Sequence, residues 1–249
     1  MILLFQSYGA DLACTDNNGR NALHHAILRN DKISCIFLVN RNCPLDERDN
    51  FGFTPLVLAI QRNNMEIVRF LVKNGAVIYP EKGPLHCMPL VTAAYFGVLD
   101  ILNFLLSVSE SDLKKKDMHM NYALCMASYT DRANLTQFLI NKGASLSRWN
   151  PGDQSPLEFA VMADNRDIIS LLISSGADVH DRDHLGYTPI MHAAISNSPS
   201  AASLLISYGA NPKETANDMR TSTNTIVEKL NHKEVAHILF LWDYEVYPH

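Results

Sequence analysis

Large apolar residues recur along the chain with the spacing of short amphipathic helices, and the same arrangement returns about every 33 residues. One position of each repeat holds a pair of large apolar residues. The pairs are Phe37-Leu38, Phe70-Leu71, Phe104-Leu105, Phe138-Leu139, Leu171-Leu172, Leu204-Leu205 and Ile238-Leu239. A position in the preceding helix holds the small residues Ala26, Ala59, Ala93, Ala127, Ala160 and Ala193. The pattern predicts helix pairs that approach closely at alanine and bury both members of each apolar pair.

Polar caps and turn residues separate the predicted helices. Thr54, Ser155 and Thr188 each precede a proline, which places a capping side chain before a residue suited to the first helical position. A glycine follows most of the second helices and favours the left-handed conformation that ends a helix. Residues 49–52 and 183–186, each running from aspartate to glycine, predict tight turns before the next cap.

These residues resemble the ankyrin repeat, whose opening Thr-Pro-Leu-His-x-Ala is matched in part by residues 21–26 and 54–59, and whose later part is matched by 171–179. The resemblance implies an all-α ankyrin-repeat solenoid with β-hairpin-like turns, in a single domain over 1–249. The expected units are a partial unit 1–15, repeats 16–48, 49–82, 83–116, 117–149, 150–182 and 183–216, and a terminal capping unit 217–249.

Three segments depart from the repeat. The chain starts within what reads as the second helix of a unit, which predicts either that it is part of a longer chain or complex or that its N-terminus is frayed. The last unit carries polar residues such as Asn224 and Lys229, as expected of a cap that meets water. Residues 107–120 lack the closing glycine and contain the run Lys114–Lys116, for which we expect an irregular, solvated loop.

Composition and charge limit the classes of function that the sequence supports. The chain of 249 residues has a net charge of -5 and 47% hydrophobic residues, which describes a folded protein and argues against a nucleic-acid binder. No apolar run approaches the roughly 18 residues of a membrane span, so membrane insertion is not expected. Five cysteines without a Cys-x-x-Cys pair indicate reduced thiols and a cytoplasmic or nuclear protein.

Motifs for catalysis are missing from the sequence. There is no glycine-rich phosphate loop, no Gly-x-Ser-x-Gly elbow and no cluster with two pairs of Cys or His ligands at the short, fixed spacing that zinc sites require. His24 falls on the histidine of the repeat signature, where the resemblance implies a structural hydrogen bond. We therefore expect no enzyme activity, no cofactor and no metal.

The resemblance implies that a protein partner binds the concave face, which is built from turn tips and first helices. Carried over by position, the expected contact residues are Phe51, Phe53, Arg62, Tyr95, Phe96, Tyr129, Trp149, Met162, Leu185 and Tyr187. Several are aromatic and out of phase with the core, which predicts an exposed patch for a peptide or helix with apolar anchors. His180 resembles the position modified by the hydroxylase of ankyrin repeats and is a candidate for hydroxylation.

Three functions remain open at this point. The first is a non-catalytic scaffold or adaptor that binds a partner peptide or domain through the concave surface. The second is a small-molecule or nucleotide sensor that uses Trp149, Tyr129 and the run Lys114–Lys116. The third is a cytosolic ankyrin arm of a larger enzyme or channel.

Overall fold

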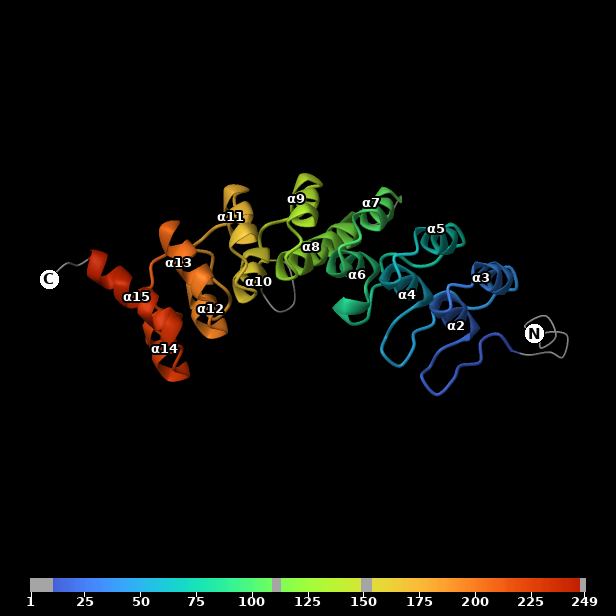
Figure 1. Ribbon diagram of the computed structural model, residues 1–249, viewed down its shortest axis with the longest axis horizontal. Helices are drawn as coiled ribbons and strands as arrows, with labels where there is room; N and C mark the ends of the chain where they lie inside the picture. Colours follow the sequence, from blue (N-terminus) through green and yellow to red (C-terminus); the bar gives the residue numbers. More distant parts are fainter. Residues whose placement is uncertain (1–10, 109–112, 149–153, 247–249) are drawn as a thin grey trace. The chain divides into compact units, whose positions relative to one another are not determined.

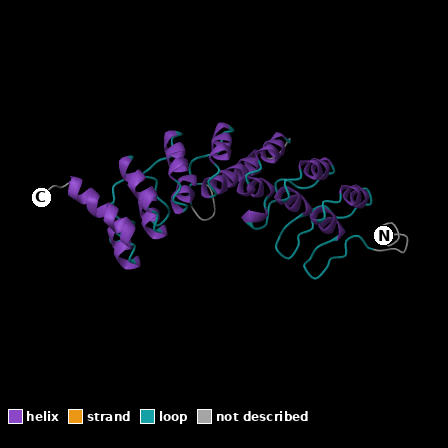
Figure 2. Cartoon of the chain, in the orientation of Figure 1, coloured by secondary structure: helices purple, strands orange, loops and turns teal. Residues whose placement is uncertain are grey.

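The computed structural model describes residues 11–108, 113–148 and 154–246, with residues 243–246 described by their backbone only. The chain divides into two compact units, residues 1–119 and 120–249. Figure 2 shows that the described residues form helices joined by loops and turns. Their single β-bridge joins Thr215 and Ser222. The expected all-α fold is confirmed.

The first unit stacks three helix pairs. Its elements are α2 (Ala22–Leu28), α3 (Lys32–Val39), α4 (Pro55–Gln61), α5 (Met65–Lys73), the short 3-10 helix η1 (Leu85–Cys87), α6 (Pro89–Phe96), α7 (Leu99–Ser107) and the first part of α8 (Leu113–Tyr129). The first helices of successive pairs pack in the order α2, α4 and α6, and the second helices α5 and α7 pack side by side (Figure 1).

The second unit repeats the same packing. After the second part of α8 its elements are α9 (Ala133–Asn141), α10 (Pro156–Met162), α11 (Arg166–Ser174), α12 (Pro189–Ser196), α13 (Pro199–Ser207), α14 (Thr223–Leu230) and α15 (Lys233–Val246). Helices α10, α12 and α14 form one row, and α9, α11, α13 and α15 form a second row, as Figure 1 shows. Each helix pair therefore lies against the pair before and after it, as in a repeat solenoid.

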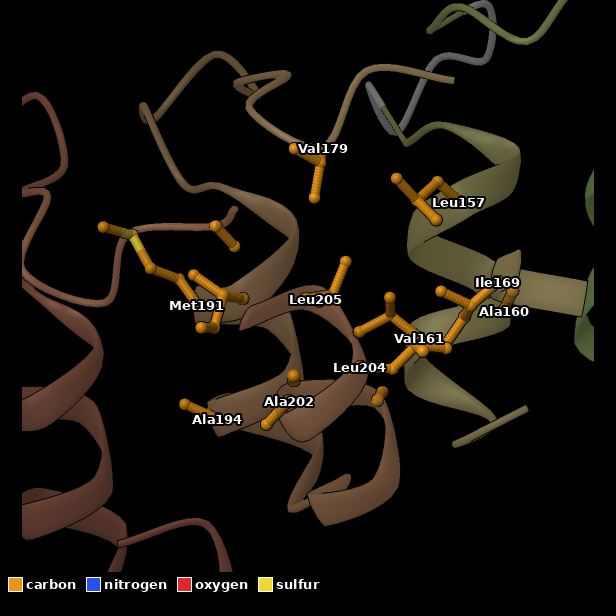
Figure 3. Close-up of a cluster of buried hydrophobic side chains, with 14 of the residues drawn as sticks. Leu157, Ala160, Val161, Ile169, Val179, Met191, Ala194, Ala202, Leu204 and Leu205 are labelled. Atoms are coloured by element: carbon orange, nitrogen blue, oxygen red, sulfur yellow. The ribbon is translucent and has the colours of Figure 1, made fainter. Parts of the chain in front are cut away.

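The core lies between the two rows of helices. The repeated alanines are buried, and in the second unit Ala160 and Ala193 let α10 and α12 approach each other. Leu172 and Leu205, the second members of their apolar pairs, have no exposed surface. Figure 3 shows how Leu205 and its neighbours from several helices fill the space between the repeats. The apolar pattern thus marks the core correctly at these positions.

The phenylalanines of the apolar pairs differ from expectation, because they are only half-buried. The Arg41 guanidinium lies 5.2 Å from the centre of the Phe37 ring, and that of Arg69 lies 4.5 Å from the Phe104 ring. The prediction that both members of each pair are buried is therefore wrong for these repeats. A cation stacked on an aromatic face covers the ring that the helix pair leaves open.

Side-chain caps begin most of the first helices. The hydroxyls of Thr54 and Ser155 accept backbone N–H groups as expected, and Ser155 forms a reciprocal capping box with Glu158. Thr188 stands at the start of α12, but its hydroxyl makes no hydrogen bond within the described residues. There Pro189, whose φ is fixed near the helical value, starts the helix without a side-chain bond.

The run Lys114–Lys116 belongs to α8, so the expected solvated loop is wrong for this segment. Residues 109–112 lie outside the described part. The Lys116 ammonium donates to the Leu106 carbonyl oxygen at 2.7 Å, and Lys115 pairs with Glu81 at 3.1 Å. Lys116 thus satisfies a carbonyl at the end of α7, and Lys115 ties the start of α8 to the preceding repeat.

The terminal unit is less polar than expected. Leu230 at the end of α14 and Phe240 and Leu241 on α15 are exposed, Phe240 to 66% of its surface. The Lys213 ammonium lies 5.6 Å from the Trp242 ring centre. The unit therefore combines polar residues with open apolar surface.

Replacing Gly186 with alanine is expected to lower the free energy of unfolding of the second unit by more than the same change at Gly176. Both glycines have positive φ, which costs alanine about 1–2 kcal/mol. An added Cβ at Gly186 would also clash with the Asn217 side chain and backbone, whereas nothing lies within 4 Å of one at Gly176. Urea denaturation of both variants measures the difference, and equal midpoints would contradict it.

Candidate protein-binding surface

The turn tips of both units are built by an aspartate. The Asp49 carboxylate accepts the backbone N–H groups of Phe51 and Phe53 at 3.0 and 2.9 Å. Asp183 accepts those of Leu185 and Tyr187 in the same way, at 2.9 and 2.8 Å. These Asx turns fix the backbone of each tip so that the side chain of Phe51, or of Leu185 in the second unit, points outward.

The side chains at the tips divide into two kinds. Phe51 and Leu185 are 58% and 50% exposed, as expected for contact residues. Phe53 and Tyr187 are half-buried, because the ring of Phe53 lies edge-on to His86 and that of Tyr187 lies edge-on to His192. Of the four predicted tip residues, Phe51 and Leu185 thus offer the larger open surface.

In each unit, hydrogen bonds link two neighbouring tips and hold them in place. In the first unit Asn50 donates its backbone and side-chain N–H groups to the carbonyls of Asn18 and Asn17, both at 2.9 Å. In the second unit Asn217 donates in the same manner to the Leu185 and His184 carbonyls, both at 3.0 Å. The tips are therefore a fixed platform within each unit.

Several first-helix ends expose large side chains, many of them apolar. In the first unit Tyr95 and Phe96 are 48% and 43% exposed and meet edge to face, with ring centres 5.2 Å apart. Arg62, at the end of α4, is also exposed. The position of Tyr95 and Phe96 within the repeat, away from the core positions, predicts that they lie outside the core. Their exposure agrees with this prediction.

The second unit carries a row of such side chains on α8, α10 and α12. Tyr129, Met162 and Ile195 are 46%, 38% and 40% exposed, and each stands at the end of its helix. The Tyr129 ring is supported by the edge of Phe159, with centres 6.3 Å apart. We call these three side chains the unit-2 row. They occupy the same position of three successive repeats.

Trp149 and His180 are the two remaining predicted residues. Trp149 lies outside the described residues. His180 is exposed in the loop after α11, with its Nδ1 atom 3.9 Å from a Glu214 carboxylate oxygen.

Sequence reasoning missed a buried charged cluster in the second unit. Glu158 has no exposed side-chain surface, and both its carboxylate oxygens accept from the Arg148 guanidinium, at 2.5 and 3.0 Å. Arg148 Nε lies 3.1 Å from Asp181, and His192 Nε2 lies 3.1 Å from Asp183 and 3.5 Å from Glu158. The available signal was Glu158 itself, because it stands where the repeat signature has histidine.

Several of the described cysteines and histidines are buried in the structure. Burial raises the pKa of the Cys125 thiol to about 12 and that of Cys35 to about 11, so both stay protonated at neutral pH. His24 bonds Asn21 through Nδ1 and the Phe53 carbonyl through Nε2, at 2.7 and 3.1 Å, which is the structural role expected of it. Burial lowers its pKa. In the described residues, no group of three or more His, Cys, Asp or Glu side chains could hold a metal ion.

None of the described helices is long and apolar enough to cross a membrane.

Comparison with known proteins supplies the family. The sequence pattern for "Ankyrin repeats (3 copies)" matches residues 1–81 and 90–183, and the one for "Ankyrin repeat" matches residues 185–214. The crystal structure of the human ASB11 ankyrin repeat domain aligns with a TM-score of 0.66 at 20% identity, covering 83% of this chain and 91% of that one. The match to ASB11 shows a shared fold.

Several curated relatives are much longer proteins. An L-asparaginase of Dirofilaria immitis is 26% identical over 64% of this chain and 27% of its own length. The human transient receptor potential cation channel subfamily A member 1 is 31% identical over 49% of this chain and 11% of its own. A putative palmitoyltransferase ZDHHC13 of Danio rerio is 32% identical over 48% of this chain and 19% of its own. The chain thus spans about a quarter or less of the length of these relatives. Because the ankyrin-repeat patterns match most of its residues, the chain belongs to the ankyrin repeat family.

Proposed function

We propose that this chain is a non-catalytic interaction module that binds a partner peptide or protein domain through the turn tips and first-helix ends of its repeats. The observation that carries the proposal is the unit-2 row, in which Tyr129, Met162 and Ile195 are exposed at one position of three successive repeats. Exposed apolar side chains that gather on a rigid scaffold are typical of protein-binding surfaces. Membership of the ankyrin family supports the same conclusion, since its domains are generally protein-interaction modules.

The chemistry of this surface favours a segment with apolar anchors. Aromatic side chains contribute most to binding where they are supported from below and can be fully covered by the partner. Tyr129 meets both conditions, because Phe159 holds its ring while almost half of its surface stays open. In the first unit Tyr95 and Phe96 offer a comparable pair.

The variant Tyr129→Ala/Met162→Ala/Ile195→Ala is expected to lose its protein partners, with at least a tenfold fall in affinity for each. Affinity capture from source-cell lysate, quantified by mass spectrometry, compares it with the wild type. The matched control is Ile33→Ala/Phe240→Ala, which removes two apolar side chains that are 82% and 66% exposed but lie on the second helices α3 and α15, away from the turn tips and first-helix ends. Circular dichroism establishes that both variants are folded.

The proposal holds if proteins captured by the wild type and the control are lost from the triple variant. Equal capture by all three would contradict it for the second unit. The variant Tyr95→Ala/Phe96→Ala then tests the surface of the first unit in the same way.

A second candidate is that the module is the ankyrin segment of a larger enzyme or channel. It is favoured by the relatives, of which the chain matches only a part. An antibody against residues 154–242 would detect a cellular protein much larger than 27.9 kDa if this is so. The sensor hypothesis has less support, because Lys115 pairs with Glu81 and Lys116 with the Leu106 carbonyl.

A further inference from the structure

A depression of about 430 Å³ lies beside the unit-2 row. Its lining combines one aromatic ring with polar and acidic side chains from the ends of α8 and α10 and the start of α11. Among the lining residues are Tyr129, Asp131, Asp164, Arg166 and Asp167. Because Tyr129 also belongs to the unit-2 row, a partner that covers this row also meets the depression.

The carboxylates of Asp131 and Asp164 are not required by the turns that carry them. Both residues have positive φ, 55° and 52°, and follow their helices at a position where other repeats of this chain have asparagine. Asp131 Oδ1 accepts from the Asn165 side chain at 2.6 Å. The equivalent bond in the first unit joins Asn64 to the neutral amide of Asn30, at 2.5 Å. Asp164 Oδ1 accepts the backbone N–H of Ala201, in the first turn of α13, at 2.6 Å. An asparagine oxygen can accept each of these bonds, so neither hydrogen bond requires a negative charge.

The depression carries an excess of negative charge. Asp131, Asp164 and Asp167 line it against the single cation Arg166, which leaves a formal charge of about -2. The ion pairs that the described residues of the second unit form use other carboxylates, those of Glu158, Asp181, Asp183 and Glu214. Asp131 is exposed and Asp164 is partly exposed, so their carboxylates are within reach of a ligand.

We infer that this depression receives a lysine or arginine side chain of the partner, so that the partner is an amphipathic segment with basic residues beside its apolar anchors. The inference rests on the proposed function and specifies the chemistry of the ligand. The aliphatic part of the basic side chain lies along the Tyr129 ring, and its charged end lies between the Asp131 and Asp164 carboxylates. An aromatic face next to carboxylates suits a guanidinium or ammonium group through both charge and cation–π attraction.

The test uses a defined probe, a phage-displayed library of random 12-residue peptides selected against the purified full chain. The most enriched peptides are synthesised with a fluorophore, and fluorescence anisotropy gives their dissociation constants. Each is also made with its basic residues changed to glutamine. We expect the selected peptides to be enriched in apolar residues together with lysine or arginine.

The variant Asp131→Asn/Asp164→Asn is expected to bind these peptides about three- to tenfold more weakly, as the loss of two solvent-exposed charge contacts implies. It keeps the residue type that the chain uses at the same turns elsewhere. The matched control Asp178→Asn removes a carboxylate from a loop outside the depression and should bind as the wild type does. Raising the salt concentration should weaken wild-type binding more than binding to the double variant.

The peptide variants complete a double-mutant cycle. If the basic side chain contacts these carboxylates, changing it to glutamine weakens binding to the wild type but adds little to the effect of Asp131→Asn/Asp164→Asn. Peptides that lose affinity with Tyr129→Ala but are insensitive to the aspartate changes would overturn this inference and leave the proposed function standing. Selection that yields no peptide sensitive to Tyr129→Ala would count against both.

Discussion

Replacing Arg148 with methionine is expected to lower the free energy of unfolding of the second unit by about 3–5 kcal/mol. The guanidinium donates to both oxygens of Glu158, whose side chain has no exposed surface. Without Arg148 this carboxylate stays buried with a much weaker set of partners, namely the Ser155 backbone N–H at 3.2 Å and the His192 imidazole at 3.5 Å. An uncompensated buried charge is among the most destabilising changes that a single substitution makes. Urea denaturation followed by far-UV circular dichroism measures the loss.

A second variant separates the buried charge from the lost packing. In Arg148→Met/Glu158→Gln the carboxylate is gone, while glutamine still offers an oxygen to the Ser155 backbone N–H, which Glu158 accepts at 3.2 Å. We expect the double variant to recover most of the stability that Arg148→Met loses. A double variant as unstable as the single one would show that Arg148 acts by packing, and an unchanged midpoint for Arg148→Met would contradict the prediction itself.

Much of the fold is predictable from the sequence because the repeats share the same pattern of residues. The pattern consists of alanine at the helix contact, leucine on the buried side of the second helix and an Asp-to-Gly turn. Because it recurs at a fixed period, a repeat with an unclear pattern can be assigned from its neighbours. The prediction failed where two repeats interact through long side chains. Neither the stacking of Arg69 on Phe104 nor the ion pair between Lys115 and Glu81 has a local signature, since each joins residues of two different repeats.

The candidate surface likewise has one part that is predictable from the sequence and one part that is not. Exposure of Tyr95 and Tyr129 follows from phase, because the core positions of their repeats are already occupied by other residues. The acidic depression does not, since Asp131 and Asp164 stand on turns where charged and neutral residues fit equally well. Their significance emerges only when the turn of one repeat is seen next to the helix start of the next, which brings them to the same depression as Tyr129.

Changing Leu105 to alanine is expected to lower the free energy of unfolding of the first unit by about 2–5 kcal/mol, as removal of a fully buried leucine does. Leu105 on α7 has no exposed surface, and its neighbours Ile101 and Leu102 are equally enclosed, so the cavity cannot fill with water from outside. The bond from the Tyr79 hydroxyl to the Leu105 carbonyl, 3.1 Å long, involves the backbone and persists in the variant.

The loss at Leu105 therefore reports packing alone, and the exposed residue Asn103 on the same helix provides the control. Asn103→Ala should leave the urea midpoint nearly unchanged, because it removes no buried surface and alanine favours the helix. In a stack of repeats each unit is stabilised mainly by its neighbours, so the cavity at Leu105 weakens contacts of α7 with α5 and α6 as well as α7 itself. Equal midpoints for Leu105→Ala and Asn103→Ala would mean that this leucine does not hold the repeats together.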